Sequence, residues 1–224
     1  QIEWLKRLNI KDIVVCVGYL ADSIKNYFGD GSKIGMNITY SYEKTQLGTA
    51  GAIKNAEKFI KGTFLVLNGD TYAKINFEKL LKFHKEKRSS LTVALNKYKE
   101  TIRYGSVSID GEYQIKKFLE KPNSRISNLI NSGVYVLEPN ILRYIPKNRD
   151  VSLEKEIFPL LIKKNLLHGY VWKGYFVDMG IPESYKQLKE DILNSILIKK
   201  YSTIKDAMKI LSKTGLGVVL VVDN

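Results

Sequence analysis

The stretch FLVLNGDT, residues 64–71, indicates how this chain folds. Four apolar residues run directly into an amide, a glycine and a carboxylate. A short apolar run bounded by turn residues is typical of a buried strand. In an open sheet of parallel strands, ligands bind beyond the carboxyl ends of the strands. We therefore expect a strand at 63–67 that leads into a binding site at Asn68, Gly69 and Asp70.

Strands and helices alternate on both sides of this stretch. Apolar runs predict further strands, and apolar residues at helical spacing predict helices between them. The expected strands are 12–17, which is predicted to be buried on both faces, 36–42 and 90–95. The expected helices are 2–8, 20–28, 52–60 and 77–81, the last capped by Asn76. This alternation is typical of a mostly parallel, doubly wound sheet.

The middle of the chain has a different pattern. Asp110 and Gly111 lie between two strand-like segments, 104–109 and 113–119, and predict a hairpin. Later strands are expected at 131–137, 168–172 and 175–177. A hairpin adds antiparallel strands to the parallel ones. The expected fold class is therefore α/β, a Rossmann-like, doubly wound mixed sheet.

Capping residues and prolines mark the later helices. Ser152 is expected to cap a short helix that Pro159 ends or kinks, and Pro182 suits the first turn of another. A boundary is expected near Asn194. The β-α-β piece beyond it is too small to bury a core alone. The expected domains are 1–193 and 194–224, the second being the start of a truncated domain.

Composition excludes several classes of protein. The 224 residues are 44% hydrophobic, as in a globular domain, and the net charge is +13. The lysines are spread among acidic residues, which favours a solvated surface over a nucleic-acid partner and also suits an anionic substrate. The single cysteine, Cys16, lies in an apolar run, so we expect a buried thiol and no intrachain disulfide. No apolar run is long enough to span a membrane, and we expect a cytoplasmic protein with no membrane partner.

Two aspartates follow apolar strands in the same way. Asp70 ends the first stretch, and Asp178 lies in YFVDMG, residues 175–180, where a glycine again follows closely. Magnesium commonly takes one or two carboxylates and completes its shell with phosphate oxygens and water. The pair is expected to hold one Mg²⁺ together with phosphate. The alternative for each is a turn aspartate that only ends a strand.

Four loop motifs carry further polar or small residues. In EKTQLGTAGA, residues 43–52, Gly48 and Gly51 flank a tight turn into a helix, where backbone groups suit a base edge or an anion. In EKP, residues 120–122, the lysine suits a phosphate and the glutamate a sugar hydroxyl. The motifs RYG and NSG, residues 103–105 and 131–133, begin strands. The alternative for the first two motifs is an ordinary turn, between a strand and a helix for EKTQLGTAGA and at the exposed surface for EKP.

Nothing in the sequence suggests a nucleophile or a zinc site. His84 and His168 are isolated, and we interpret both as structural or surface residues. No Ser-His-Asp or Cys-His set is evident, and no cysteine–histidine cluster has zinc spacing.

The order of these motifs is more specific than any one of them. LGTAGA, LNGD, RYG, EKP, NSGVYVLEP, SLEKEIFP and VDMGIPESY follow one another as in sugar-1-phosphate nucleotidylyltransferases, which the chain resembles over residues 1–193. It is most similar to the branch that makes GDP-mannose and GDP-heptose. The tail, residues 201–224, resembles the opening β-α-β of a cystathionine-β-synthase (CBS) domain. Such domains often bind adenine nucleotides and regulate an attached enzyme.

The resemblance implies a role for each matching residue. Asp70 and Asp178 match the magnesium-binding aspartates and, with Lys121, make up the implied catalytic set. The implied nucleotide-binding residues are Glu43, Gly48 and Thr49, with Glu43 facing a guanine edge. The implied sugar-phosphate residues are Tyr104, Gly105, Glu120, Lys121, Asn131 and Gly133.

The implied reaction joins an NTP, with GTP favoured, to a mannose-type or heptose-type sugar 1-phosphate. A phosphate oxygen attacks the α-phosphorus in line and pyrophosphate leaves, so catalysis is positioning and charge stabilisation. Other bases, other sugars and a homo-oligomer stay open. The alternative function is a catalytically silent, nucleotide-sensing regulatory subunit, against which the two acidic metal positions argue.

The chain departs from the family at its start. The family's glycine-rich signature, with its arginine and a following Pro-Lys, would precede Gln1 and is absent from the sequence. That signature cradles the triphosphate. We therefore expect the segment to be inactive without upstream residues, and the CBS portion to be truncated as well.

Overall fold

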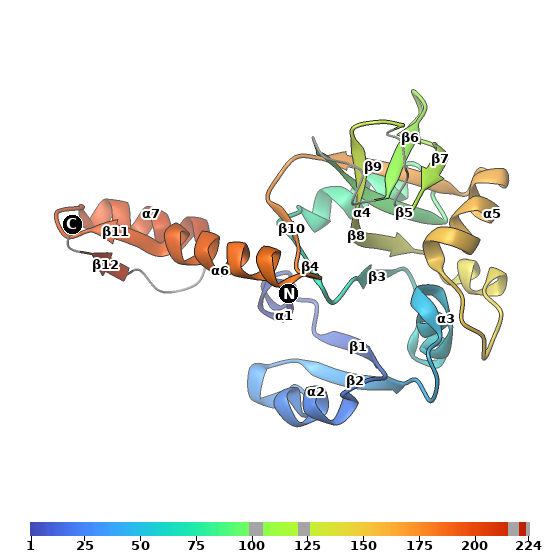
Figure 1. Ribbon diagram of the computed structural model, residues 1–224, viewed down its shortest axis with the longest axis horizontal. Helices are drawn as coiled ribbons and strands as arrows, with labels where there is room; N and C mark the ends of the chain where they lie inside the picture. Colours follow the sequence, from blue (N-terminus) through green and yellow to red (C-terminus); the bar gives the residue numbers. More distant parts are fainter. Residues whose placement is uncertain (99–104, 121–125, 215–219, 223–224) are drawn as a thin grey trace. The chain divides into compact units, whose positions relative to one another are not determined.

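The computed structural model describes residues 1–98, 105–120, 126–214 and 220–222 (Figure 1). Helices and strands alternate along most of the chain, and the expected mixed α/β fold with a multi-stranded sheet is confirmed. The chain divides into two compact units. Unit 1 consists of Gln1–Asn68 and Ala73–Tyr175, and unit 2 consists of Gly69–Tyr72 and Phe176–Asn224.

The elements agree with most of the expected ranges to within a few residues. The α-helices are α1 (Ile2–Arg7), α2 (Ala21–Phe28), α3 (Gly48–Asn55), α4 (Phe77–Glu86), α5 (Phe158–Lys163), α6 (Pro182–Ile196) and α7 (Ile204–Thr214). The strands are β1 (Asp12–Val17), β2 (Asn37–Tyr42), β3 (Phe64–Leu67), β4 (Thr71–Ala73), β5 (Leu91–Lys97), β6 (Ser106–Ile109), β7 (Ile115–Leu119), β8 (Leu129–Leu137), β9 (Leu167–Trp172), β10 (Phe176–Asp178), β11 (Leu197–Lys199) and β12 (Leu220–Val222). Short 3₁₀ turns are η1 (Ser32–Ile34), η2 (Glu57–Phe59) and η3 (Pro139–Tyr144), and η4 (Leu153–Ile157) is a π-helical turn.

Strand β8 organises the larger sheet of unit 1 (Figure 1). It pairs antiparallel with β3, β5 and β6, and β9 pairs parallel with β5. Strands β3, β5 and β9 therefore run in one direction, with their carboxyl ends at the same edge. The side chains of β5 and β8 are almost all buried, and they pack with α5 in the main core. The polar residues at the start of β8 thus stand on a rigid, apolar support.

A β-bulge interrupts the pairing of β5 with β8. The register shifts between Val93 and Leu95, opposite the segment from Asn131 to Tyr135. Gly133 lies in this segment with a φ of +62°, a conformation that glycine adopts without steric cost. Bulges of this kind bend a strand and re-aim its side chains. The glycine of the NSG motif is therefore required by the strand itself.

Strands β1 and β2 form a separate parallel pair. Helices α2 and α3 both pack against β2. Within the described residues β1 has no other strand partner, and most of its side chains are only half-buried or exposed. The expectation of a doubly buried strand was wrong, and so was that of a buried cysteine, because Cys16 is exposed.

The hairpin and two of the predicted helix starts are confirmed. Strands β6 and β7 pair around the turn at Asp110. The side chain of Asn76 accepts a hydrogen bond from the Lys79 amide at 2.9 Å, and Pro182 lies in the first turn of α6.

The segment after Ser152 differs from its prediction in one respect. Ser152 caps it as expected, but the capped turn is π-helical, and Pro159 lies in the first turn of α5 instead of ending a helix. Proline is tolerated there because the first amides of a helix have no intrahelical acceptor.

Unit 2 holds the last elements of the chain. Strand β10 pairs with β4, α6 runs without a break from Pro182 to Ile196, and α6 contacts α7. Strands β11 and β12 pair in parallel and are connected through α7, which is the predicted β-α-β piece. No helix in the described residues combines the length and apolar character needed to cross a membrane.

Candidate functional site

Asp70 and Asp178 approach each other within unit 2. Strands β4 and β10 pair beside them, and the Met179 amide donates to the Asp70 carbonyl at 2.6 Å. A Cβ placed on Gly180 would lie 3.0 Å from Asp178 Oδ1 and 3.6 Å from Asp70 Oδ2. Two carboxylates from distant parts of the sequence therefore border the same small space, and a glycine keeps that space free of a side chain.

This pair fits the ligand preference of magnesium. Asp70 is exposed and Asp178 is half-buried, and Asp178 Oδ1 accepts the Gly180 amide at 2.9 Å. Among the described residues no group of three or more histidine, cysteine, aspartate or glutamate side chains gathers as metal ligands. Two carboxylates are enough for a hard cation whose remaining ligands are phosphate oxygens and water. Asp70 and Asp178 are thus the residues that would hold Mg²⁺.

Three residues of the predicted sugar-phosphate set lie together in unit 1. The backbone amide of Asn131 donates to the Gly105 carbonyl at 3.1 Å. A Cβ on Gly105 would lie 3.0 Å from Glu120 Oε2 and 2.7 Å from the Phe118 ring. A larger residue at position 105 would therefore collide with the Phe118 ring and crowd the Glu120 carboxylate. The close approach explains why a glycine stands there.

The side chain of Asn131 is held at both of its polar atoms. Its Oδ1 accepts the Gly133 amide at 3.0 Å, and its Nδ2 donates to the Tyr135 hydroxyl at 2.8 Å. The Gly133 carbonyl in turn accepts the Asn68 amide at 2.9 Å. The bulge thus fixes the side-chain amide of Asn131. Through Gly133 it also connects Asn131 to Asn68, the residue that follows β3.

The loop before α3 packs closely on residues 149–151. Gly48 has a φ of +68°, and a Cβ there would lie 2.7 Å from the Val151 carbonyl oxygen and would also collide with the Asp150 carboxylate. The Val151 carbonyl accepts the amides of Ala50 and Gly51 at 2.9 and 3.3 Å. The turn is therefore tied to this segment by its own hydrogen bonds, and Thr49 is exposed.

Glu43 lies where β1 and β2 both end. Its backbone amide donates to the Val17 carbonyl at 2.8 Å, and its Oε2 accepts the Leu47 amide at 3.2 Å. One carboxylate oxygen therefore closes the loop that leads to Gly48.

Two predicted site residues, Tyr104 and Lys121, lie outside the described residues, as does Arg103 of the same motif. His84 and His168 are buried and bonded to Thr92 and Ser89, at 2.8 and 3.0 Å. Both histidines are therefore structural, as predicted.

Tyr135 and Glu154 were missed by the sequence reasoning. Tyr135 is fully buried, and its hydroxyl donates to Glu154 Oε1 at 3.1 Å. Burial raises the pKa of Tyr135 well above its usual value, so the hydroxyl stays protonated. A signal for Tyr135 was present: strand residues two and four apart share a face, which places Tyr135 with Asn131 and Gly133.

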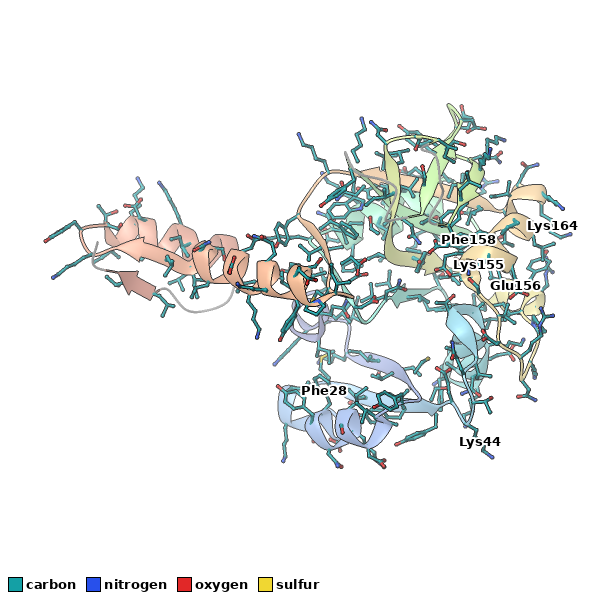
Figure 2. The ribbon with its side chains drawn as sticks, in the orientation of Figure 1. Phe28, Lys44, Lys155, Glu156, Phe158 and Lys164 are labelled. Atoms are coloured by element: carbon teal, nitrogen blue, oxygen red, sulfur yellow. The ribbon has the colours of Figure 1, made fainter. Side chains whose placement is uncertain are left out.

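Glu154 lies in the π-helical turn η4. Figure 2 labels the two residues that follow it, Lys155 and Glu156, and Phe158, the first residue of α5. Its Oε2 accepts the Thr49 hydroxyl at 2.9 Å. No periodicity predicts this contact, because Thr49 and Glu154 are far apart in the sequence.

The model of the family described as nucleotidyl transferase matches residues 1–195. A mannose-1-phosphate guanylyltransferase of Mycobacterium tuberculosis is 35% identical over 190 residues, which cover 84% of this chain and 53% of that protein. A mannose-1-phosphate guanyltransferase of Yarrowia lipolytica is 36% identical, over 83% of this chain and 52% of its own length. The chain thus spans about half the length of these relatives.

Solved structures also resemble this one. The crystal structure of HddC from Yersinia pseudotuberculosis complexed with GMP-PN is 31% identical, with a TM-score of 0.73. The match covers 85% of this chain and 82% of that one. A second structure of HddC gives a TM-score of 0.75 at the same identity and coverage.

Proposed function

Because the chain belongs to the nucleotidyl transferase family, we propose that the protein transfers a guanylyl group from GTP to a mannose-type or heptose-type sugar 1-phosphate and releases pyrophosphate. The observation that carries the proposal is the approach of Asp70 and Asp178 to one small space. The names of the relatives, which are mannose-1-phosphate guanylyltransferases, support guanine and mannose. A neighbour crystallised with GMP-PN supports a guanine nucleotide as well.

In this proposal Asp70 and Asp178 hold Mg²⁺. When bound, the cation supplies positive charge that offsets the charge of the phosphates. The half-buried Asp178 is oriented by the Gly180 amide, whereas the exposed Asp70 keeps its carboxylate free to adjust. A phosphate oxygen of the sugar attacks the α-phosphorus, and the bond to the β-phosphate breaks. Phosphate is already a competent nucleophile, so the protein needs no nucleophile of its own.

The sugar 1-phosphate is assigned to the residues around Gly105. Glu120 and Asn131 flank this glycine and offer a carboxylate and an amide to sugar hydroxyls. Lys121 is assigned to the phosphate and Tyr104 to the sugar. Gly133 completes the assigned set. A pocket of fixed polar groups selects a substrate by the hydrogen bonds that a wrong substrate leaves unpaired.

The nucleoside is assigned to the loop from Glu43 to Thr49. The amides of Ala50 and Gly51 are already bonded to Val151, so the donors at the start of α3 that suit a ligand are those of Gly48 and Thr49. Glu43 Oε2 closes the loop, which leaves Oε1 to accept from a guanine edge. A carboxylate acceptor suits guanine because its N1 and exocyclic N2 are both donors.

The proposal extends to residues 194–224 as the opening of a CBS domain that binds adenine nucleotide. The parallel pair of β11 and β12 around α7 supports it. Ile204 and Met208 on α7 and Val221 on β12 are exposed, as expected if further chain covers them. Calorimetric titration of the full-length protein with AMP and ATP tests this part. We expect at least one of the two nucleotides to bind, and binding of neither contradicts the proposal.

Pyrophosphate release by the full-length protein tests the enzyme. Each of the four NTPs is combined with mannose-, heptose-, glucose- and glucosamine-1-phosphate, with Mg²⁺ and then with EDTA. We expect release with GTP and one of the first two sugars, and none with EDTA. If the folded protein releases no pyrophosphate with any combination, the proposal is overturned.

A further inference from the structure

Glu154 is the centre of a hydrogen-bond network in unit 1. Its Oε1 accepts the Tyr135 hydroxyl at 3.1 Å, and its Oε2 accepts the hydroxyls of Thr49 and Ser152 at 2.9 and 3.1 Å. Tyr135 in turn accepts from Asn131 at 2.8 Å. We call these five residues, Thr49, Asn131, Tyr135, Ser152 and Glu154, the Glu154 network.

The network has a fixed direction. The Asn131 amide donates to Tyr135, Tyr135 donates to Glu154, and Thr49 donates to Glu154 from the other side. Thr49 is also an acceptor, because the Leu153 amide donates to its hydroxyl at 2.7 Å. The carboxylate is the shared acceptor that orients both hydroxyls. A neutral amide in its place offers one acceptor and one donor group, so one arm must lose its bond.

The local backbone is built to deliver this carboxylate. In η4 the Ser152 carbonyl accepts the amides of Glu156 and Ile157 at 3.1 and 3.4 Å, a wider turn than an α-helix makes. The Ser152 hydroxyl caps the turn at the Lys155 amide. Single π-helical turns occur frequently at functional sites. The turn places Glu154 against Thr49, whereas Glu156 pairs with Arg149 at 2.6 Å.

The two arms end at residues with different proposed roles. Thr49 belongs to the loop assigned to the nucleotide, and Asn131 belongs to the strand assigned to the sugar. Within the described residues Glu154 is half-buried and has no ion-pair partner, and its carboxylate accepts hydrogen bonds from three hydroxyl groups. Three hydrogen bonds to one carboxylate fix the positions of the hydroxyl groups that donate them. The arrangement points to a role in ordering the two arms.

We propose that Glu154 is a positioning residue that holds Thr49 and Asn131 in one arrangement, so that the nucleotide side and the sugar side of the reaction are coupled. The inference rests on the function proposed above. It assigns Glu154 no contact with substrate. Its effect passes through Thr49 on one arm and through Tyr135 and Asn131 on the other.

Steady-state kinetics of full-length Glu154→Gln test this, with GTP and the preferred sugar 1-phosphate each varied. We expect the KM of both substrates to rise and kcat/KM to fall about tenfold to a hundredfold, because misplaced groups lose transition-state contacts. A merely structural role lowers the melting temperature and the active fraction, which reduces kcat and leaves both KM values unchanged. Glu190→Gln, on an exposed position of α6, is the control and is expected to stay within about twofold of wild type.

Thr49→Val provides the second measurement, and it decides the case if Glu154→Gln fails to fold. Loss of the Thr49 hydroxyl is expected to raise the KM of the sugar 1-phosphate as well as that of GTP. A change confined to GTP overturns the coupling. If Glu154→Gln has the KM values of the wild type, this inference alone is overturned. If the wild-type enzyme releases no pyrophosphate, the inference and the proposed function are both overturned.

Discussion

The aspartate pair and the Glu154 network differ in how far the fold has already satisfied their polar atoms. Asp70 is exposed, and the hydrogen bond at 2.6 Å uses its carbonyl and not its side chain. Glu154 accepts three hydroxyl groups, and its partner Tyr135 is completely buried. Carboxylates that wait for a cation must keep oxygens unbonded, whereas a carboxylate that orients other residues must be bonded in advance.

This difference predicts how each group responds to substitution. Removing a carboxylate that makes no hydrogen bond within the fold is expected to reduce activity and to leave stability unchanged. Removing a member of a hydrogen-bonded network leaves its partners without hydrogen bonds, which is expected to reduce both activity and stability. Four measurements test the contrast.

Asp70→Asn gives the largest expected effect. The amide keeps the size of the side chain and removes the charge, and we expect turnover to fall at least about a hundredfold, since a metal ligand supports several kcal/mol of transition-state stabilisation. The melting temperature should stay that of the wild type. Turnover with GTP and the sugar 1-phosphate checks this in the full-length protein.

Asp22→Asn is the control for this variant, because Asp22 is exposed in the first turn of α2. Wild-type turnover in Asp70→Asn would remove the metal assignment. A large loss of stability would instead show that the aspartate pair resembles the Glu154 network after all.

Gly48→Ala is expected to cost both stability and activity. A Cβ at this position adopts an unfavourable backbone conformation and meets the Val151 carbonyl oxygen at 2.7 Å. We expect a loss of about 1–3 kcal/mol in the free energy of unfolding, together with a higher KM for GTP. Urea denaturation and kinetics measure the two effects.

Gly62→Ala is the matched control, because a Cβ on Gly62 meets no atom within 4 Å. Equal stabilities of the two variants would contradict the close approach of residues 150–151 to the loop.

Tyr135→Phe removes a single hydroxyl from the Glu154 network, at its one fully buried member. The Asn131 amide and Glu154 Oε1 then lose a partner, and we expect a loss of about 1–3 kcal/mol in the free energy of unfolding. Urea denaturation gives the value. Tyr27→Phe on the exposed face of α2 should be neutral. A neutral Tyr135→Phe would show that the network is not satisfied as described.

Much of the fold was predictable from residues that act locally. The Asn76 cap, the Asp110–Gly111 hairpin and Pro182 each specify the backbone within a few residues of themselves. The approach of Asp70 and Asp178 follows from one further rule, that ligands lie at the carboxyl ends of strands. Local chemistry and strand direction thus account for the elements and for the candidate metal pair.

The remaining features depend on contacts between distant segments. The exposure of Cys16 depends on which strands pair with β1, and a single apolar run carries no information on its neighbours. The bond from Thr49 to Glu154 joins α3 to the π-helical turn η4 and forms only when these distant segments pack together. The sequence therefore pointed to the residues that we propose to face the substrates, but not to Glu154 and Tyr135, which hold two of them.

Acidification offers the smallest and most selective test of the contrast. His84 is buried in a second network that includes none of the proposed site residues, with Thr92 at 2.8 Å and Glu138 at 3.1 Å. Burial lowers the pKa of His84, against an opposing contribution from Glu138, and burial also lowers the pKa of His168. Both groups therefore bind protons less readily in the folded than in the unfolded chain.

Stability should consequently be complete above the unfolded histidine pKa, about 6.5, and should decline as the pH falls below it. We expect the urea midpoint to drop between pH 7.5 and 5.5, and to drop less in His84→Gln. A midpoint independent of pH would contradict the buried neutral histidine. Because this network serves packing alone, His84→Gln should leave both KM values unchanged, and that result would separate a satisfied network that only stabilises from the Glu154 network, which also positions.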